Sequence, residues 1–138
     1  QYVDNYYGTP RDYVEHKLED GFDVILEIEI QGALKIREKF PDTVLMFLMP
    51  PTADELKKRL EGRGTEDEAT IKKRLLRAVE ESQGVEEYDY IVINDVLDDC
   101  VEQIHEIIGN EHCKASNNLE KINQFRDELT NMWKGDIR

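Results

Sequence analysis

The stretch DVILEIEIQG, residues 23–32, decides the fold predicted for this chain. Its apolar run is interrupted only by Glu27 and Glu29. Because successive strand residues point to opposite faces, a strand here places both glutamates on one face and the even-numbered apolar residues from Val24 to Ile30 on the other. The run ends at a glycine, where a helical pattern begins. The carboxylates would then lie at the carboxyl end of a buried strand, where open α/β sheets bind ligands. A half-exposed strand with one polar face fits the same pattern.

Helical and strand patterns alternate around this stretch. Thr9 and Pro10 begin a helix that Gly21 ends, and after Gly32 a second helical pattern runs to Pro41. The apolar run 43–49 has strand length, and Thr52 with Glu55 forms a capping box for the next helix. A glycine-containing acidic loop, a helix from residue 71, a strand over 88–94 and a helix from residue 96 or 97 follow. This order predicts an α/β fold of three layers, with a mainly parallel sheet flanked by helices.

Composition and charge limit the kinds of ligand. The 138 residues include 18 basic and 31 acidic side chains, giving a net charge of -13, which argues against a general nucleic-acid or acidic-membrane surface. No run approaches the ~20 apolar residues of a membrane span, and no signal peptide is recognisable. Two cysteines without metal-ligand spacing indicate reduced thiols in a cytoplasmic protein. His105 and His112, seven residues apart, are expected at the surface.

Three arginines flank the loop between the two middle helices. Arg59, Arg63 and Arg74 are planar bidentate donors of the kind that hold phosphate oxygens. They could instead pair with nearby acids such as Glu55 and Asp67. Carboxylates at a strand end can hold a hydrated magnesium ion, while arginines on a mobile loop can close over phosphates. Together these features favour a phosphoryl-transfer site.

Six motifs carry a family resemblance. NYYGTP, DVILEIEIQGA, FLMPP, LKKRLEGRGTE, IKKRL and YDYIVIND, in this order, resemble the guanylate kinase family of nucleoside monophosphate kinases from about Asn5 to about Ile108. EIE in place of DID is similar to Gram-positive bacterial members. The resemblance implies transfer of the ATP γ-phosphate to GMP, giving GDP and ADP, with Mg²⁺. AMP or dGMP as the acceptor stays open.

The resemblance also assigns roles to individual positions. For GMP these are Tyr7, Thr9, Glu27 and Glu29; the two glutamates also lie near the hydrated metal, with their separate roles left open. For ATP they are Arg59, Arg63 and Asn94. Arg63 and Arg74 match the arginines that act on the transferring phosphate, and losing either should reduce turnover far more than folding.

The chain departs from the family at its start. A guanylate kinase begins with a strand and a GxxxxGK[ST] P-loop, and this sequence contains no such motif. Gln1 in first place indicates a processed chain, a fragment or an incomplete sequence. The chain resembles the carboxyl-terminal two thirds of the enzyme, a P-loop-kinase-type fold without the P-loop strand. We therefore expect the chain alone to be inactive.

The expected parts are a remnant of the GMP-binding lobe (1–22), a core domain (23–113) with a lid near 62–70, and an amphipathic helix (114–138). That helix or an exposed sheet edge could join two copies in a homo-oligomer. One alternative function is a non-catalytic guanylate-kinase-like module that binds proteins or phosphopeptides. Another is an acidic α/β interaction domain. The missing P-loop favours the phosphopeptide module, and the retained arginines favour the enzyme.

Overall fold

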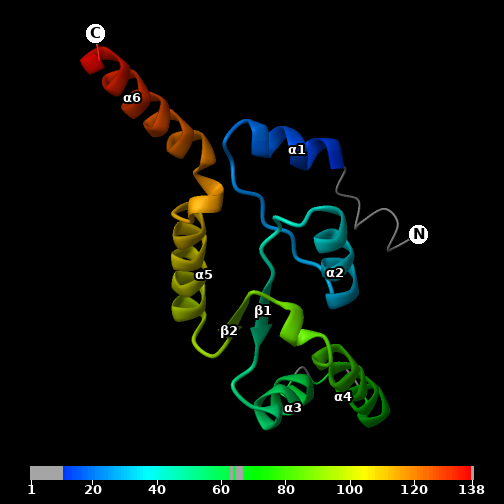
Figure 1. Cartoon of the computed structure of the whole chain (residues 1–138). Helices are drawn as coiled ribbons and strands as arrows, with labels where there is room; N and C mark the ends of the chain where they lie inside the picture. The colour runs from blue at the N-terminus through cyan, green and yellow to red at the C-terminus, as the bar shows by residue number, and fades with distance from the viewer. Residues whose placement is uncertain (1–10, 63, 65–66, 138) are drawn as a thin grey trace. The chain divides into compact units, whose positions relative to one another are not determined.

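The computed structural model describes residues 11–62, 64 and 67–137 (Figure 1). Its elements are, in order, α1 (Arg11–Glu19), α2 (Ile30–Lys39), β1 (Met46–Met49), α3 (Ala53–Gly62), α4 (Glu68–Ser82), the 3-10 turn η2 (Val85–Glu87), β2 (Tyr90–Ile93), α5 (Leu97–His112), the 3-10 turn η3 (Ala115–Asn117) and α6 (Leu119–Ile137). Strands β1 and β2 form a short parallel sheet. The predicted α/β class is therefore confirmed.

The chain divides into two compact units between Ile91 and Val92. The first unit contains α1 to α4 and β1, and the second contains α5 and α6. The buried apolar residues among those described are few: Ile30, Ala33 and Leu45 in the first unit, and Val92, Cys100 and Ile107 in the second. Because these cores are small, many large apolar side chains of the described residues stay exposed.

Gly21 ends α1, as the sequence predicts. Its φ of +90° is a left-handed conformation that glycine adopts without strain. The Phe22 amide donates to the Lys17 carbonyl (3.0 Å), and the Gly21 amide donates to the Leu18 carbonyl (3.1 Å). These two bonds form a Schellman motif, which satisfies carbonyls left open at the helix end.

The strand predicted over residues 24–30 is wrong. Residues 23–29 are not assigned to any strand, and α2 already begins at Ile30. A strand needs a hydrogen-bonded neighbour, and in the described part of the chain only β1 and β2 pair with each other. The segment therefore leaves apolar side chains in solvent, including Ile25, which is 74% exposed.

The other predicted helices are present, although α4 begins at Glu68, three residues before the predicted start at Ile71. The Glu55 amide donates to Thr52 Oγ1 at the start of α3 (3.1 Å), and the Thr70 amide donates to Asp67 Oδ1 at the start of α4 (2.8 Å). His105 and His112 are exposed, as predicted. Among the described helices, none is both long and apolar enough to cross a bilayer.

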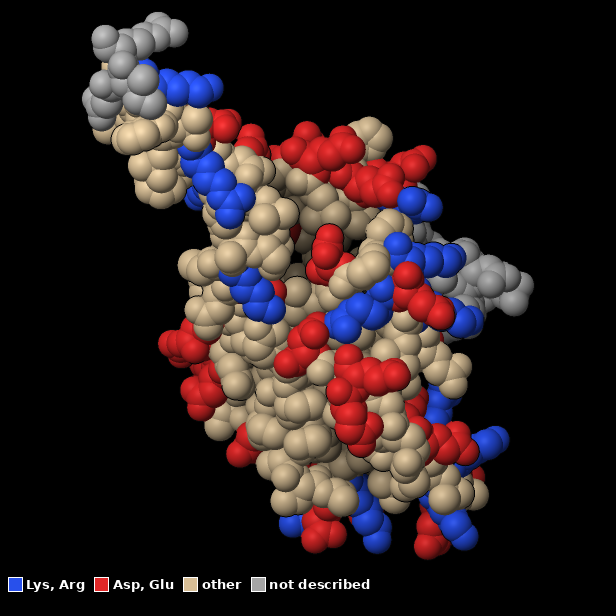
Figure 2. Space-filling view, viewed as in Figure 1, with Lys and Arg blue, Asp and Glu red and all other residues tan. Residues whose placement is uncertain are grey.

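Acidic side chains are spread over the face shown in Figure 2 and are interspersed with basic ones. Opposite charges at this spacing partly cancel and are screened by salt. An anionic ligand on this face would therefore be held by individual arginines or lysines rather than by a continuous basic surface.

Candidate functional site

Glu29 caps the N-terminus of α2. Its Oε1 accepts from the Gly32 amide (2.8 Å) and its Oε2 from the Gln31 amide (3.0 Å). The negative charge also lies at the positive end of the helix dipole, where the electrostatic interaction is favourable. Each carboxylate oxygen has a further lone pair, so the same group can accept a hydrogen bond from a ligand or a water molecule.

A cleft of about 230 Å³ opens beside Glu29. The residues that line it come from the start of α2 and the end of α4: Glu29, Ile30, Gln31, Leu34, Arg77, Glu80, Glu81 and Gly84. A Cβ on Gly84 would lie 3.2 Å from Ile30 Cδ1, so glycine permits the close approach of these two segments. Three carboxylates against one arginine suit a ligand that donates hydrogen bonds.

Tyr88 is half-buried close to this cleft. Its ring contacts Phe47 edge-on, with centroids 5.4 Å apart. Burial, followed by the negative charges of Glu29 and Glu81, raises the pKa of the Tyr88 phenol above its ordinary value. The hydroxyl therefore stays protonated at neutral pH and can act as a hydrogen-bond donor.

Two of the predicted arginines stand on helices that contact each other, α3 and α4 (Figure 1). Arg59 Nε donates to Glu55 Oε1 at 3.2 Å, so the carboxylate pairing that the sequence left open is present for Arg59. Arg74 lies on an exposed part of α4. An i,i+4 pair at the surface is worth about 0.3–0.5 kcal/mol, so a phosphate could displace Glu55 from Arg59 at small cost.

Comparison with known families agrees with the motifs. The family model described as guanylate kinase matches residues 1–111. The chain belongs to the guanylate kinase family. Three curated guanylate kinases are similar to it: those of Halalkalibacterium halodurans (51% identical, 91% of this chain and 61% of the relative), Latilactobacillus sakei (48%, 93% and 63%) and Oceanobacillus iheyensis (52%, 83% and 55%). The chain thus spans between 55% and 63% of the length of these relatives.

The other residues predicted for the guanylate kinase site are Glu27, Asn94, Tyr7, Thr9 and Arg63. Glu27 is exposed on the extended segment, and since no strand forms, the predicted strand face shared with Glu29 is not formed either. Asn94 follows β2, in the second unit, and is partly buried. Tyr7, Thr9 and Arg63 lie outside the described residues.

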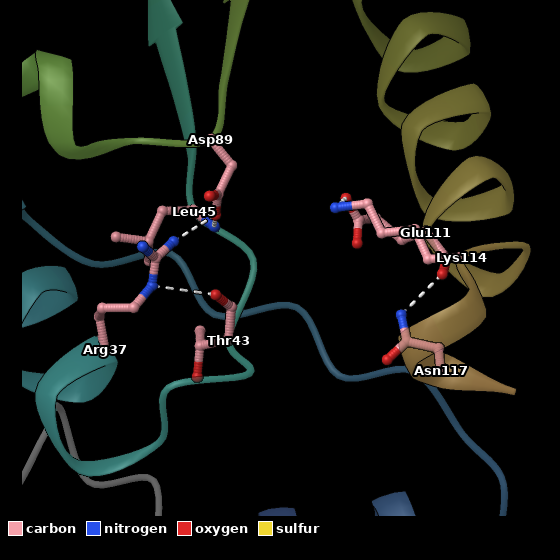
Figure 3. Close-up of polar contacts among 7 residues, drawn as sticks. All are labelled: Arg37, Thr43, Leu45, Asp89, Glu111, Lys114 and Asn117. Carbon is pink, nitrogen blue, oxygen red and sulfur yellow. Dashed lines mark hydrogen bonds and ion pairs between the residues drawn. The ribbon is translucent and has the colours of Figure 1, made fainter. Parts of the chain in front are cut away.

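Sequence reasoning missed a polar contact between Arg37 and Asp89 (Figure 3). Asp89 Oδ2 also accepts from the Leu45 amide (2.8 Å), and Arg37 Nε donates to the Thr43 carbonyl (3.1 Å). The two side chains join the end of α2 to the starts of β1 and β2. Because 52 residues separate them, no local pattern could reveal the pairing.

Proposed function

We propose that this chain is part of a guanylate kinase that transfers the γ-phosphate of ATP to GMP. In this reaction a GMP phosphate oxygen forms a bond to the γ-phosphorus, the bond to the bridging oxygen of ATP breaks, and GDP and ADP leave. The observation that carries the proposal is the family match over residues 1–111, supported by about 50% identity to curated guanylate kinases. A cytoplasmic location belongs to the same proposal.

The acceptor side of the proposed site uses Glu29 and Glu27 together with Tyr7 and Thr9. The geometry of Glu29 supports this role, because its carboxylate is fixed by two backbone amides next to an acidic cleft. Guanine carries an N–H and an amino group on one edge, and such carboxylates can accept hydrogen bonds from both. Adenine lacks that pair of adjacent donors, so this chemistry favours GMP over AMP.

The donor side uses Arg59, Arg63 and Asn94 for ATP, and Arg63 with Arg74 for the transferring phosphate. Arg59 and Arg74 come from contacting helices, so one movement of α3 and α4 could bring both to the phosphates. An arginine that stabilises the transferring group contributes roughly 10³ to 10⁵ in rate in related chemistry.

Mg²⁺ is expected with ATP, and the described residues fit a hydrated ion. No group of three or more His, Cys, Asp or Glu side chains in the described part of the chain gathers to coordinate a metal directly. Glu29 can accept from water while its oxygens also accept from Gln31 and Gly32. When bound, Mg²⁺ would neutralise charge on the phosphates.

A chimera tests the proposal. The part of the Halalkalibacterium halodurans guanylate kinase that this chain does not cover is joined to this chain, and ADP formation is followed in a coupled assay. We expect ADP only when both ATP and GMP are present. A chimera that binds GMP without forming ADP, or that binds a phosphopeptide instead, would support the non-catalytic module.

Arg74→Ala in this chimera should lower kcat by roughly 10³ or more, because the lost guanidinium stabilises the transferring phosphate. Lys72→Ala is the matched control, since Lys72 is an exposed cation on the same helix. It should stay within about twofold of the parent. Equal effects of the two changes, at unchanged circular dichroism, would contradict the role of Arg74.

A further inference from the structure

The two walls of the cleft beside Glu29 are also joined at a point outside the cleft. One wall is the start of α2, and the other is the end of α4 with Gly84. From Gly84 the chain passes through η2 and reaches Asp89 within five residues. Asp89 contacts Arg37, which lies in the last turn of α2 (Figure 3). The contact between Arg37 and Asp89 therefore connects the far end of one wall to the continuation of the other.

Further hydrogen bonds fix both partners of this contact. The Leu45 amide donates to Asp89 Oδ2 (2.8 Å), and the Asp89 amide donates to the Leu45 carbonyl (2.9 Å). Leu45 itself is buried. Arg37 Nε donates to the Thr43 carbonyl (3.1 Å), while another nitrogen of the same guanidinium donates to Asp89. Because the guanidinium fork is planar and rigid, holding two acceptors at once fixes the direction of the Arg37 side chain.

Packing alone holds α2 against η2 only weakly near this contact. A hollow of about 540 Å³ opens between them, lined by Leu34, Lys35, Arg37, Glu38 and Glu87. Side chains that face such a space lack partner atoms on one side and lose the attraction that close contact provides. At the start of α2, Ile30 Cδ1 packs against Gly84, where a Cβ would lie only 3.2 Å away. The spacing of the two walls therefore depends on the Ile30 contact at one end of α2 and on the Arg37 contact at the other.

We propose that Arg37 and Asp89 are positioning residues, whose contact holds the two walls of the cleft at the spacing that fits GMP. This inference rests on the proposed function, which places the acceptor beside Glu29. Arg37 acts through α2, which begins directly after Glu29, and Asp89 acts through η2 and Gly84. The walls contact GMP both before and during phosphoryl transfer. Loss of their spacing therefore weakens binding in both states, which raises KM for GMP and leaves kcat largely unchanged.

NMR of the intact chain without nucleotide tests the spacing directly. The nuclear Overhauser effect between the Ile30 δ1 methyl group and the Gly84 α protons depends steeply on their separation. Arg37→Ala should weaken this signal because α2 is no longer held at its far end. Lys35→Ala is the matched control, since Lys35 is an exposed cation on the same helix, and it should leave the signal unchanged. A folded Arg37→Ala chain with the parent signal would overturn the proposal.

Kinetics of the chimera with the Halalkalibacterium halodurans segment test the consequence for the reaction. Arg37→Ala should raise KM for GMP roughly tenfold, with kcat and KM for ATP within about twofold of the parent. Lys35→Ala should leave all three unchanged. Arg37→Lys keeps the charge without the fork, so it should give an intermediate KM, and it replaces Arg37→Ala in both measurements if that variant does not fold.

Two outcomes separate this proposal from the proposed function. A variant that is less stable but, while still folded by circular dichroism, keeps the parent KM for GMP would mean that Arg37 is merely structural, and the positioning role would be wrong. A chimera that forms no ADP would contradict the proposed function instead. The signal between Ile30 and Gly84, which needs no nucleotide, would then still decide whether Arg37 sets the spacing of the walls.

Discussion

Residues 23–29 and 89–93 are both short apolar runs that carry acidic side chains, but only the second contains a strand. The second run begins with Asp89, whose carboxylate contacts Arg37 and the Leu45 amide, and its backbone pairs with β1. The first run has no paired strand among the described residues and leaves Ile25 in solvent. Apolar alternation therefore indicates the capacity to form a strand, and a neighbouring strand decides whether it forms.

Of the substitutions that test this comparison, removal of the Asp89 carboxylate should lower the stability most. Asp89→Ala leaves the Leu45 amide without that acceptor and Arg37 without its ion pair. We expect a loss of about 1–3 kcal/mol in the free energy of unfolding, measured by urea denaturation. If β2 then behaves like residues 23–29, hydrogen exchange of the Asp89 and Tyr90 amides, which donate to the Leu45 carbonyl, should accelerate.

Asp42→Ala is the control for that measurement, because Asp42 is exposed in the turn between α2 and β1. Its effect should stay within about 0.5 kcal/mol. An equal loss in both variants would mean that general charge, and not the contact with Arg37 and Leu45, stabilises the strand pair.

The next largest loss of stability is expected for substitution of Glu29, and substitution of Glu27 should cost less. Glu29→Ala removes the acceptor for two amides of α2 and should cost about 1 kcal/mol, whereas Glu27→Ala should cost less than about 0.5 kcal/mol. Urea unfolding of the two variants side by side gives the difference. Had the predicted strand formed, the two glutamates would be equivalent positions on one face. Equal losses would therefore restore the strand interpretation.

Local signals predicted most of the helices because their cause is local. Gly21 can adopt positive φ, and Thr52 can accept an amide three residues later, so both helix boundaries follow from neighbouring residues. The strand over 24–30 failed because its cause lies elsewhere in the chain. For the same reason β1 begins at Met46 instead of Thr43. The Thr43 carbonyl accepts from Arg37 and the Leu45 amide donates to Asp89, which no window of sequence reveals.

The residues of the candidate site also divide into those that the sequence reveals and those that it does not. Glu29 and the arginines of α3 and α4 were found from residue type, spacing and family resemblance. The role of Glu29 as a helix cap was missed, although a carboxylate two and three residues before open amides is a recognisable signal. Tyr88 was not considered, because its proximity to Glu29 and Glu81 depends on how α2, α4 and the start of β2 pack.

The smallest effect is expected for Tyr88. This residue lies just before β2, and the negative charge of Glu29 contributes to its raised pKa, so it responds to both segments. A phenol whose pKa is raised on folding contributes full stability below the unfolded value of about 10, and this contribution is lost as the pH rises through the folded pKa. Stability should therefore fall in alkaline solution, and Tyr88→Phe should reduce that fall. In NMR titration of ¹³Cζ-labelled tyrosine, Glu29→Gln should lower the Tyr88 pKa towards its ordinary value without reaching it, because burial is the larger cause. Glu27→Gln should leave the Tyr88 pKa unchanged. An equal shift from both variants would mean that Tyr88 responds to the net charge of residues 23–29, and not to the position of Glu29 at the start of α2.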